Sequence, residues 1–328
     1  MSNNETPYLD LVRDVLNNGT LEPGRNGDTI STFGRMMRFS LKDGQLPLLT
    51  TKQVAWKTCF KELMWFVRGR TDNQELQEQG VHIWDANATR EFLDGRNLAN
   101  YPEGVLGPIY GYQWRHFNAP YIHGEEHSQY WNSNGSSGSF TGAGTSNVLL
   151  SEEQRPKPRV AVPPPHAGVD QLQQIIDALR HPTERYSRRL ILTAWNPNQI
   201  DKMALPPCHI LAQFRVRGEN RLSCALYQRS GDIGLGVPFN IASYSFLTHL
   251  LAKHCGLEAD EFAHFLGDAH IYTNHIDALK TQLEREPLAF PKIAIRCVKE
   301  RIDDYDLEDI LFVTPYAHLG KIEMAMTA

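Results

Sequence analysis

Three short runs contain the residue types from which a covalent catalytic site could be built. Cys208 follows a pair of prolines, and Arg229 and Asn240 lie in two further runs, at 228–232 and 236–240. A cysteine attacks as its thiolate, and a free thiol with a pKa of roughly 8.5 is only a few per cent ionised at neutral pH. A nearby guanidinium would favour the thiolate. The three runs therefore predict a nucleophile, an anion-binding arginine and a hydrogen-bonding amide in one neighbourhood.

A plainer interpretation of Cys208 stays open, because many single cysteines are small buried hydrophobes. The two preceding prolines favour the catalytic interpretation. They stiffen the chain and remove two N–H donors from any sheet, which suits a nucleophile held at the start of a strand.

Composition restricts the class of ligand. The chain has 328 residues, of which 41% are hydrophobic, enough for a substantial core. Its formal net charge of −5 gives no general attraction to nucleic acid or to an anionic membrane. Phosphate recognition should therefore be local, and a small phosphorylated ligand is expected rather than a polymer.

The cysteines and the N-terminus indicate a reducing compartment and no metal. Five widely spaced cysteines include no paired metal-binding spacing, and we expect them to be reduced thiols: Cys59, Cys208, Cys224, Cys255 and Cys297. The first residues lack a basic start and an apolar core, and no stretch of about 18 apolar residues follows. We expect a cytoplasmic protein without a membrane segment.

A β-hairpin should position the nucleophile and the arginine. Residues 209–217 and 221–230 read as strands joined through a short turn, and such a pairing brings Cys208 beside Arg229. A further strand is expected at 189–195. Helical periodicity predicts helices at 8–17, 60–67, 169–179 and 239–255.

A segment rich in glycine, serine and proline, at 118–167, buries little and is expected to be a flexible insertion. The rest of the chain shows neither an internal repeat nor a second composition. We therefore expect a single catalytic domain over 1–328.

Residues 195–291 closely resemble thymidylate synthase, the folate-dependent family that methylates dUMP. The similarity extends to motifs at 47–52, 62–66, 83–87 and 107–116. It implies an α/β (α+β) fold: a mixed, largely antiparallel sheet flanked by helices, packed sheet to sheet in a homodimer.

The resemblance implies catalytic roles for Cys208, Glu62, Asn240, Tyr110, His209 and Asp232. Cys208 would add to C6 of dUMP, and Asn240 would face the base. Glu62 would organise water and relay protons, which a pKa raised by burial would assist. From the residues alone, Glu62 could instead be a paired structural carboxylate, and a reoriented Asn240 amide could serve cytosine.

The family's nucleotide-binding positions match Arg25, Arg188, Arg189, Gln228, Arg229, Ser230, Asp232, Asn240, His270 and Tyr272. Arginines suit phosphate because their donors form a fixed fork. Arg188 and Arg189 would reach the partner subunit's site, while His270 and Tyr272 would bind the sugar hydroxyl. Any one of these arginines could otherwise be a solvated surface charge.

The folate co-substrate, 5,10-methylenetetrahydrofolate, would contact Lys52, Trp84, Asn87, Asp232, Gly236, Phe239 and Ala328. It would supply a carbon unit and a hydride, and no metal is implied. The chain departs from the family's pattern at Asn26, Asp28 and Gln53.

Two alternatives remain at this point. A pyrimidine-nucleotide hydroxymethylase would use the same fold but let water, not hydride, meet the intermediate. An RNA-binding regulator is the other, and the negative net charge argues against it.

Overall fold

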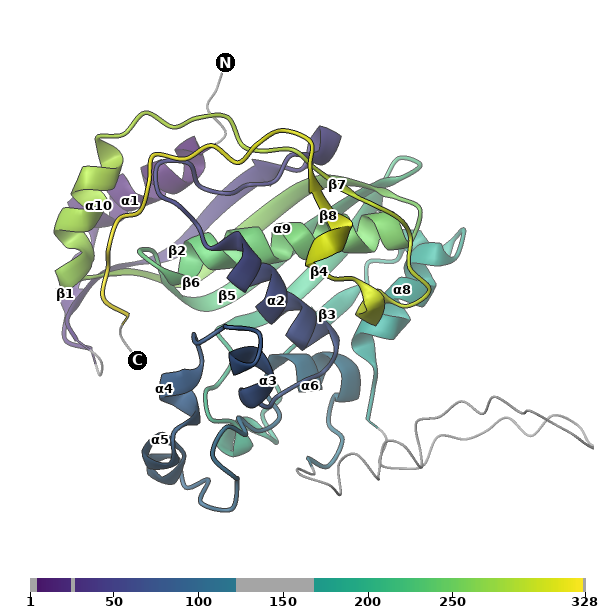
Figure 1. Cartoon of the computed structure of the whole chain (residues 1–328), viewed down its shortest axis with the longest axis horizontal. Helices are drawn as coiled ribbons and strands as arrows, with labels where there is room; N and C mark the ends of the chain where they lie inside the picture. Colours follow the sequence, from purple (N-terminus) through teal and green to yellow (C-terminus); the bar gives the residue numbers. More distant parts are fainter. Residues whose placement is uncertain (1–4, 25–26, 122–167, 327–328) are drawn as a thin grey trace, which may run out of the picture.

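Six strands form one mixed sheet within the residues that the computed structural model describes, 5–24, 27–121 and 168–326 (Figure 1). In spatial order they are β1 (Thr20–Glu22), β2 (Thr29–Ser40), β6 (Glu258–Tyr272), β5 (Arg221–Asp232), β4 (His209–Arg217) and β3 (Ile191–Thr193). All neighbours are antiparallel except β5 and β6, which run parallel. The expected mixed, largely antiparallel sheet is thus confirmed.

The predicted hairpin is present, with β4 at its expected bounds and β5 two residues longer. The strand expected at 189–195 is shorter, because only Ile191–Thr193 pairs with β4. β2 and β6 were not predicted from the sequence. β6 carries acidic and histidine side chains along its length, which obscure the alternation of a half-buried strand.

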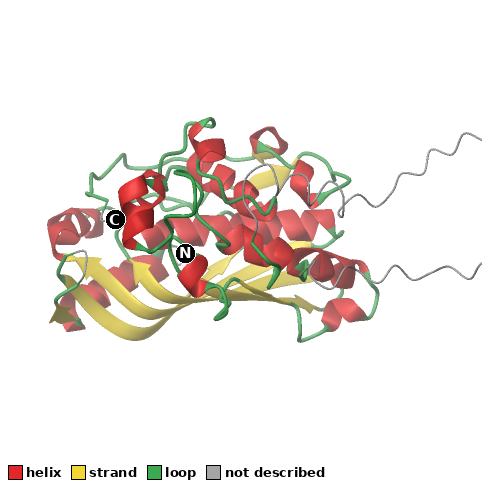
Figure 2. Ribbon diagram, turned by 90° about the horizontal axis from the view of Figure 1, so that it is seen from below, coloured by secondary structure: helices red, strands yellow, loops and turns green. Residues whose placement is uncertain are grey.

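The helices gather over one face of the sheet (Figure 2). The central one, α9 (Gly236–His254), is buried along almost its whole length and packs on β5 and β6. It begins three residues earlier than expected, since Pro238 is tolerated in a first turn. α2 (Trp56–Val67) packs across α9 and begins four residues before its predicted start.

The other predicted helices are α1 (Thr6–Asn18) and α8 (Gln171–Arg180), close to their expected bounds. Shorter elements complete the described part: α3 (Gln74–Gln77), α4 (Asp85–Ala88), α5 (Arg90–Gly95), α6 (Tyr110–His116), α10 (Ile276–Leu283), β7 (Ile293–Ile295) and β8 (Ile310–Phe312). No helix of this part is long and apolar enough to cross a membrane.

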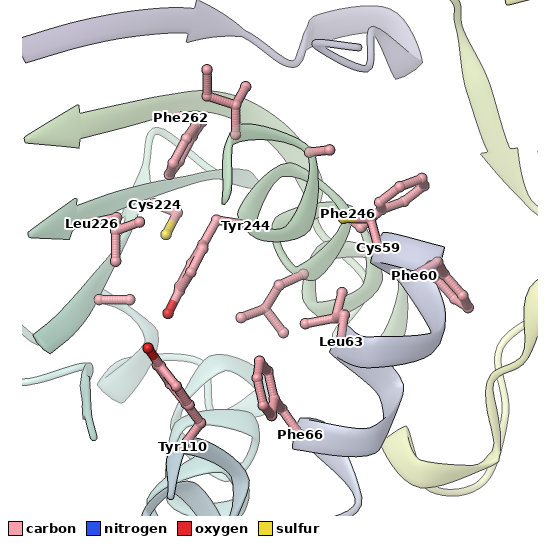
Figure 3. Close-up of a cluster of buried hydrophobic side chains, with 14 of the residues drawn as sticks. Cys59, Phe60, Leu63, Phe66, Tyr110, Cys224, Leu226, Tyr244, Phe246 and Phe262 are labelled. Atoms are coloured by element: carbon pink, nitrogen blue, oxygen red, sulfur yellow. The ribbon is translucent and has the colours of Figure 1, made fainter. Parts of the chain in front are cut away.

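Aromatic side chains from α2, α9 and the sheet fill the core (Figure 3). Phe60 meets Phe246 edge to face at 5.2 Å between ring centroids, and Tyr244 stacks on Phe262 at 6.2 Å. Such contacts add specific geometry to apolar burial. Tyr110 belongs to the same cluster, so the core directly supports residues expected in the site.

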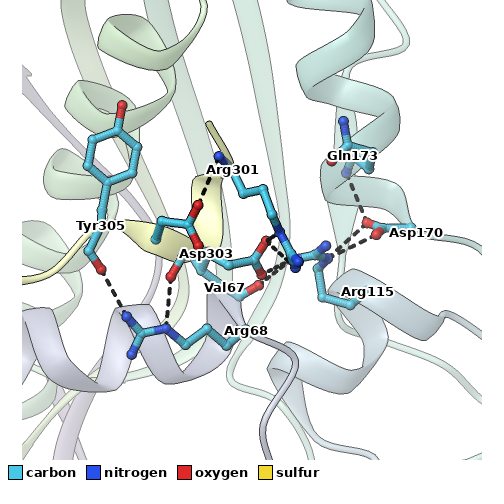
Figure 4. Close-up of polar contacts among 9 residues, drawn as sticks. Val67, Arg68, Arg115, Asp170, Gln173, Arg301, Asp303 and Tyr305 are labelled. Atoms are coloured by element: carbon cyan, nitrogen blue, oxygen red, sulfur yellow. Dashed lines mark hydrogen bonds and ion pairs between the residues drawn. The ribbon is translucent and has the colours of Figure 1, made fainter. Parts of the chain in front are cut away.

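Arg115, on α6, joins three segments that are distant in the sequence (Figure 4). Its guanidinium lies 3.0 Å from an Asp170 oxygen and 2.6 Å from Asp303 Oδ1. Next to it, Phe117 and Val169 exchange two backbone hydrogen bonds, of 2.9 and 3.0 Å. The two described segments that flank the gap at 122–167 therefore lie side by side. Most of the expected insertion at 118–167 lies outside the described residues, from 122 to 167.

The sheet face away from these helices exposes apolar side chains. Met36, Phe265 and Tyr227 stand in one row across three strands, and their exposed fractions are 48%, 38% and 39%. Large apolar side chains gathered on one face are typical of an interaction surface.

Candidate active site

Cys208 stands at the entrance to β4, one residue before the strand begins. The hairpin brings β5 beside it, and the Arg229 N–H donates to the Cys208 carbonyl at 2.9 Å. Arg229 Nη2 lies 3.8 Å from Cys208 Sγ. The nucleophile and the cation predicted from the sequence are therefore in contact.

The two prolines before Cys208 hold the Arg229 side chain in place. Arg229 Nε donates to the Pro207 carbonyl at 2.9 Å, and Nη2 donates to the Pro206 carbonyl at 3.0 Å. The guanidinium also lies 5.8 Å from the centroid of the Trp195 ring, within cation–π range. The prolines thus supply acceptors for the arginine as well as stiffness, which the sequence did not indicate.

Burial has a larger effect than Arg229 on the pKa of the Cys208 thiol. It raises the pKa of the Cys208 thiol above its ordinary value, while Arg229 and Tyr110 oppose that rise. Arg229 does favour the thiolate, as expected, but its effect is smaller than that of burial, so the net shift is upward. The thiol is protonated at neutral pH in this state and must lose its proton to attack.

Tyr110 contacts the backbone of Cys208, and the His209 ring packs near the Tyr110 ring. The Cys208 N–H donates to Tyr110 Oη at 2.8 Å, and the His209 ring lies 5.1 Å from the Tyr110 ring and 5.3 Å from that of Tyr244. Burial lowers the pKa of His209 to about 4. His209 is therefore an uncharged side chain at the edge of the site at physiological pH.

Asn240 projects from α9 toward β5. Its Oδ1 accepts a hydrogen bond of 2.9 Å from Gln228 Nε2. His209 pairs with Gln228 across the hairpin, so the amides lie next to the strand entrance that carries Cys208. A nucleophile, a guanidinium and an oriented amide thus occupy one region of the fold.

Glu62 is buried on α2, with only 9% of its surface exposed. Its carboxylate accepts a 2.8 Å hydrogen bond from Trp84 Nε1, and no cation of the described chain forms an ion pair with it. Burial raises the pKa of Glu62 to about 7, although the Trp84 bond opposes the rise. Glu62 is therefore not a salt-bridged structural carboxylate, and it can exchange a proton near neutral pH.

Asp232 closes β5 and turns the chain into α9. Its Oδ1 accepts from the N–H groups of Gly234 and Leu235, at 2.8 and 3.3 Å. His275 Nδ1 lies 3.8 Å from the same oxygen. Burial alone would raise the pKa of Asp232, but His275, Gly234 and His270 outweigh it, so the pKa lies below its ordinary value. The carboxylate is ionised at neutral pH.

Lys52 lies beside this carboxylate. Its buried ammonium donates to the Gly234 carbonyl, and Met324 Sδ is 4.0 Å away. Burial lowers the pKa of Lys52 to about 8, while Asp232 opposes that shift. A cation, Lys52, and an anion, Asp232, therefore lie side by side near Gly234, and both were predicted to contact the folate.

The remaining predicted folate contacts flank this region. Trp84 precedes α4, where Asn87 is half-buried, and Gly236 and Phe239 lie in the first turns of α9. The ring centroids of Trp84 and Tyr110 are 6.0 Å apart, so the indole lies next to the tyrosine that contacts Cys208.

Four of the predicted sugar- and phosphate-binding residues lie on β5 and β6: Arg229, Ser230, His270 and Tyr272. Ser230 follows Arg229 on β5, and the β5–β6 register sets Asp232 opposite His270. His270 Nδ1 is 2.6 Å from Asp268 Oδ1, and its ring centroid is 5.4 Å from that of Tyr272.

Two of the predicted residues that the structure describes are not brought to the site of their own chain. Arg188 and Arg189 are exposed in the loop before β3, and within the described residues no hydrogen bond or ion pair joins their side chains to Cys208 or Arg229. Arg188 instead lines a groove of about 810 Å³ on the open sheet face. Arg25 and Ala328 lie outside the described residues.

Three further residues of this region, His264, His275 and Met324, were not predicted from the sequence. His264 bonds to Gln228 at 2.8 Å, and His275 links Asp232 to the Ala325 carbonyl, 2.7 Å from its Nε2. His275 follows Tyr272, a predicted sugar-binding residue, by three positions, and this proximity was the only available signal. Nothing in the local pattern distinguishes His264 from other polar residues of β6.

The chain is similar to known proteins over nearly its whole length. The family model described as thymidylate synthase matches residues 6–328. Thymidylate synthase from equine herpesvirus 2 (strain 86/87) is 46% identical over 98% of this chain and 98% of its own length. The Homo sapiens thymidylate synthase is 46% identical over 98% of this chain and 91% of its own.

A bifunctional dihydrofolate reductase-thymidylate synthase from Leishmania major is also 46% identical over 98% of this chain. The match covers 55% of that protein. The chain thus spans about half the length of this bifunctional relative.

Proposed function

Because the chain belongs to the thymidylate synthase family, we propose that it converts dUMP to dTMP by reductive methylation, as a methyltransferase with 5,10-methylenetetrahydrofolate as co-substrate. One observation carries the proposal: Cys208 Sγ lies 3.8 Å from Arg229 Nη2, next to the oriented Asn240 amide. Together they form a nucleophile, an anion site and a base-recognition group. We also treat residues 1–328 as one catalytic domain, in keeping with the family match.

Cys208 would form a bond from Sγ to C6 of the uracil, and the electron pair of the C5–C6 double bond would move toward O4. The thiol proton would pass through water to the ionised form of Glu62 as this bond forms. Arg229 stabilises the thiolate electrostatically, and the Asn240 Nδ2 donor is suited to the negative charge that develops on O4. When the C6–Sγ bond breaks at the end, Cys208 regains its electron pair.

Glu62 would move protons through ordered water during these steps. Its pKa of about 7 makes both its protonated and ionised forms available at physiological pH. The hydrogen bond from Trp84 keeps the carboxylate in one orientation.

The residues on the folate side fit a pterin. Asp232 offers an ionised acceptor, Lys52 a buried cation, and Trp84 an aromatic surface. Bound methylenetetrahydrofolate would supply the one-carbon unit and the hydride, leaving as dihydrofolate. The relatives named thymidylate synthase favour this outcome over the hydroxymethylase, and no metal is invoked.

The direct test incubates the full chain with dUMP and methylenetetrahydrofolate. Dihydrofolate release and the mass of the nucleotide are followed together. Formation of dTMP with stoichiometric dihydrofolate supports the synthase. A hydroxymethylated nucleotide with tetrahydrofolate would overturn it in favour of the hydroxymethylase.

A homodimer, joined through the open sheet faces, would complete the site. The exposed row of Met36, Phe265 and Tyr227 supports such packing, and the Arg188 groove borders the same face. Arg188 and Arg189 would then reach the partner's nucleotide phosphate. Mixing Arg188→Glu and Cys208→Ala subunits should restore activity in heterodimers, since one site would then contain both intact residues. Verified heterodimers that stay inactive would refute the shared site.

Neither a membrane nor a nucleic acid is proposed as a partner, and a cytoplasmic location would suit the substrates. RNA binding that persists at moderate salt in the Cys208→Ala variant would contradict this.

A further inference from the structure

Gln228 lies at the centre of a buried chain of hydrogen bonds that runs from β6 to α9. Its Nε2 donates to the Ser230 carbonyl and to Asn240 Oδ1, both at 2.9 Å. Its Oε1 lies 2.8 Å from His264 Nε2. Gln228 is 2% exposed and His264 is 0% exposed, so water does not compete for these bonds.

The Ser230 carbonyl fixes the direction of every bond in this chain. A backbone carbonyl can only accept, so the group of Gln228 that faces it must be the NH₂. Gln228 Oε1 then faces His264, which must donate from Nε2. His264 Nδ1, which has no hydrogen-bond partner among the described residues, carries the lone pair of the neutral ring. Its environment agrees with a neutral ring, because burial lowers the pKa of His264 to about 3.

The same reasoning orients Asn240. Because its Oδ1 accepts from Gln228 Nε2, its Nδ2 lies on the opposite edge of the planar amide group. A donor there complements O4 of uracil, and the second lone pair of Oδ1 can accept from N3–H. Cytosine presents an amino donor at position 4 and an acceptor at N3, so both of its groups oppose this orientation.

We propose that His264 is a positioning residue that acts through Gln228 to hold the Asn240 amide in the orientation that selects uracil over cytosine. The inference rests on the proposed function, because it assumes that Asn240 faces a pyrimidine nucleotide. His264 itself touches neither the base nor the nucleophile. It acts by satisfying Gln228 Oε1, so that Gln228 keeps both of its donors on Ser230 and Asn240.

Without this donor, Gln228 would have to move to satisfy Oε1, and its bond to Asn240 would weaken. The amide of Asn240 would then keep its hydrogen bond with the His209 side chain but lose the bond that fixes its oxygen toward Gln228, and cytosine would be discriminated less. Loss of the His264 donor should therefore change the preference for dUMP over dCMP more than it changes the affinity for dUMP.

The test measures Kd for dUMP and for dCMP by calorimetry in the full chain and in three variants. His264→Phe keeps a ring but removes the donor, whereas His264→Gln restores an N–H near the same position. His249→Phe is the matched control, since His249 is another buried histidine whose Nε2 bonds to a backbone carbonyl, that of Gln45, at 2.9 Å.

We expect His264→Phe to lower the dCMP-to-dUMP ratio of Kd values by about tenfold, the effect of one unmet bond to a buried acceptor. His264→Gln should recover most of the preference, and His249→Phe should keep all of it. An unchanged ratio in His264→Phe would overturn the inference, as would an equal loss in His249→Phe.

A second measurement does not depend on variants or on nucleotides. Nitrogen-15 NMR of the histidine rings in the full chain should show His264 as the neutral tautomer protonated at Nε2. A ring protonated at Nδ1 would overturn the inference even if His264→Phe failed to fold. If the unmodified protein shows no turnover of dUMP, the proposed function fails, whereas normal turnover with an unaltered preference in His264→Phe refutes only the role of His264.

Discussion

Replacing Glu62 by glutamine should make the stability of the protein less dependent on pH. Glu62 is 9% exposed, and burial raises its pKa to about 7 from an ordinary value of 4.5. The folded state therefore binds the proton more tightly than the unfolded state. Proton binding by Glu62 therefore stabilises the folded state fully below pH 4.5, and this stabilisation is lost as the pH rises through about 7.

The size of the effect follows from the two pKa values. At about 1.4 kcal/mol per pKa unit, the carboxylate costs the folded state roughly 3 kcal/mol at a pH well above 7. Glutamine is neutral at every pH and keeps an oxygen that can accept from Trp84 Nε1. The free energy of unfolding of Glu62→Gln, relative to the unmodified protein, should rise by about 2–3 kcal/mol between about pH 5 and pH 8.

Urea denaturation at fixed protein concentration, repeated across this pH range, measures the difference directly. Glu78→Gln serves as the control, because Glu78 is exposed and has no burial cost to remove. The turnover of Glu62→Gln should fall, since the amide cannot exchange a proton near neutral pH. A stability difference that stays constant from about pH 5 to pH 8 would refute the reasoning.

Three further outcomes are expected. Cys208→Ala should abolish turnover but leave dUMP binding within a few-fold, because the thiol forms a bond and does little positioning; near-normal turnover would exclude the covalent mechanism. Arg229→Lys should weaken dUMP binding by about tenfold or more, as measured by calorimetry, because an ammonium cannot reproduce the fork that bonds to both proline carbonyls; unchanged affinity would count against a phosphate role. Trp84→Phe removes a bond that stabilises ionised Glu62, so the acidic limb of the pH–activity profile should move to higher pH; a shift to lower pH would contradict it.

Local patterns were sufficient for the hairpin and for the neighbourhood of Cys208. Alternating apolar residues and a short turn predicted β4 and β5, and their antiparallel pairing made the contact of Cys208 with Arg229 predictable. The raised pKa of Glu62 was expected only from the family resemblance, since the residues alone also suited a paired structural carboxylate; burial on α2 explains the rise.

Other features depend on contacts between segments distant in sequence. β6 is recognisable as a strand only through its pairing with β2 and β5, because its own polar residues hide the pattern. His264 lies 36 residues from Gln228, and no spacing rule connects them. The net rise in the pKa of Cys208 was also unpredictable, because it depends on how deeply the fold buries the thiol.

The paired backbones of Phe117 and Val169 have a practical consequence for engineering the protein. Two backbone hydrogen bonds join these residues on either side of the 122–167 interval. Next to them, Arg115 forms ion pairs with Asp170 and Asp303. The backbone pairing is made entirely by described residues, and the entropic cost of closing a flexible chain between two paired residues grows only slowly with its length. This position is therefore a suitable place to graft a reporter domain or an affinity tag while leaving the sheet and Cys208 untouched.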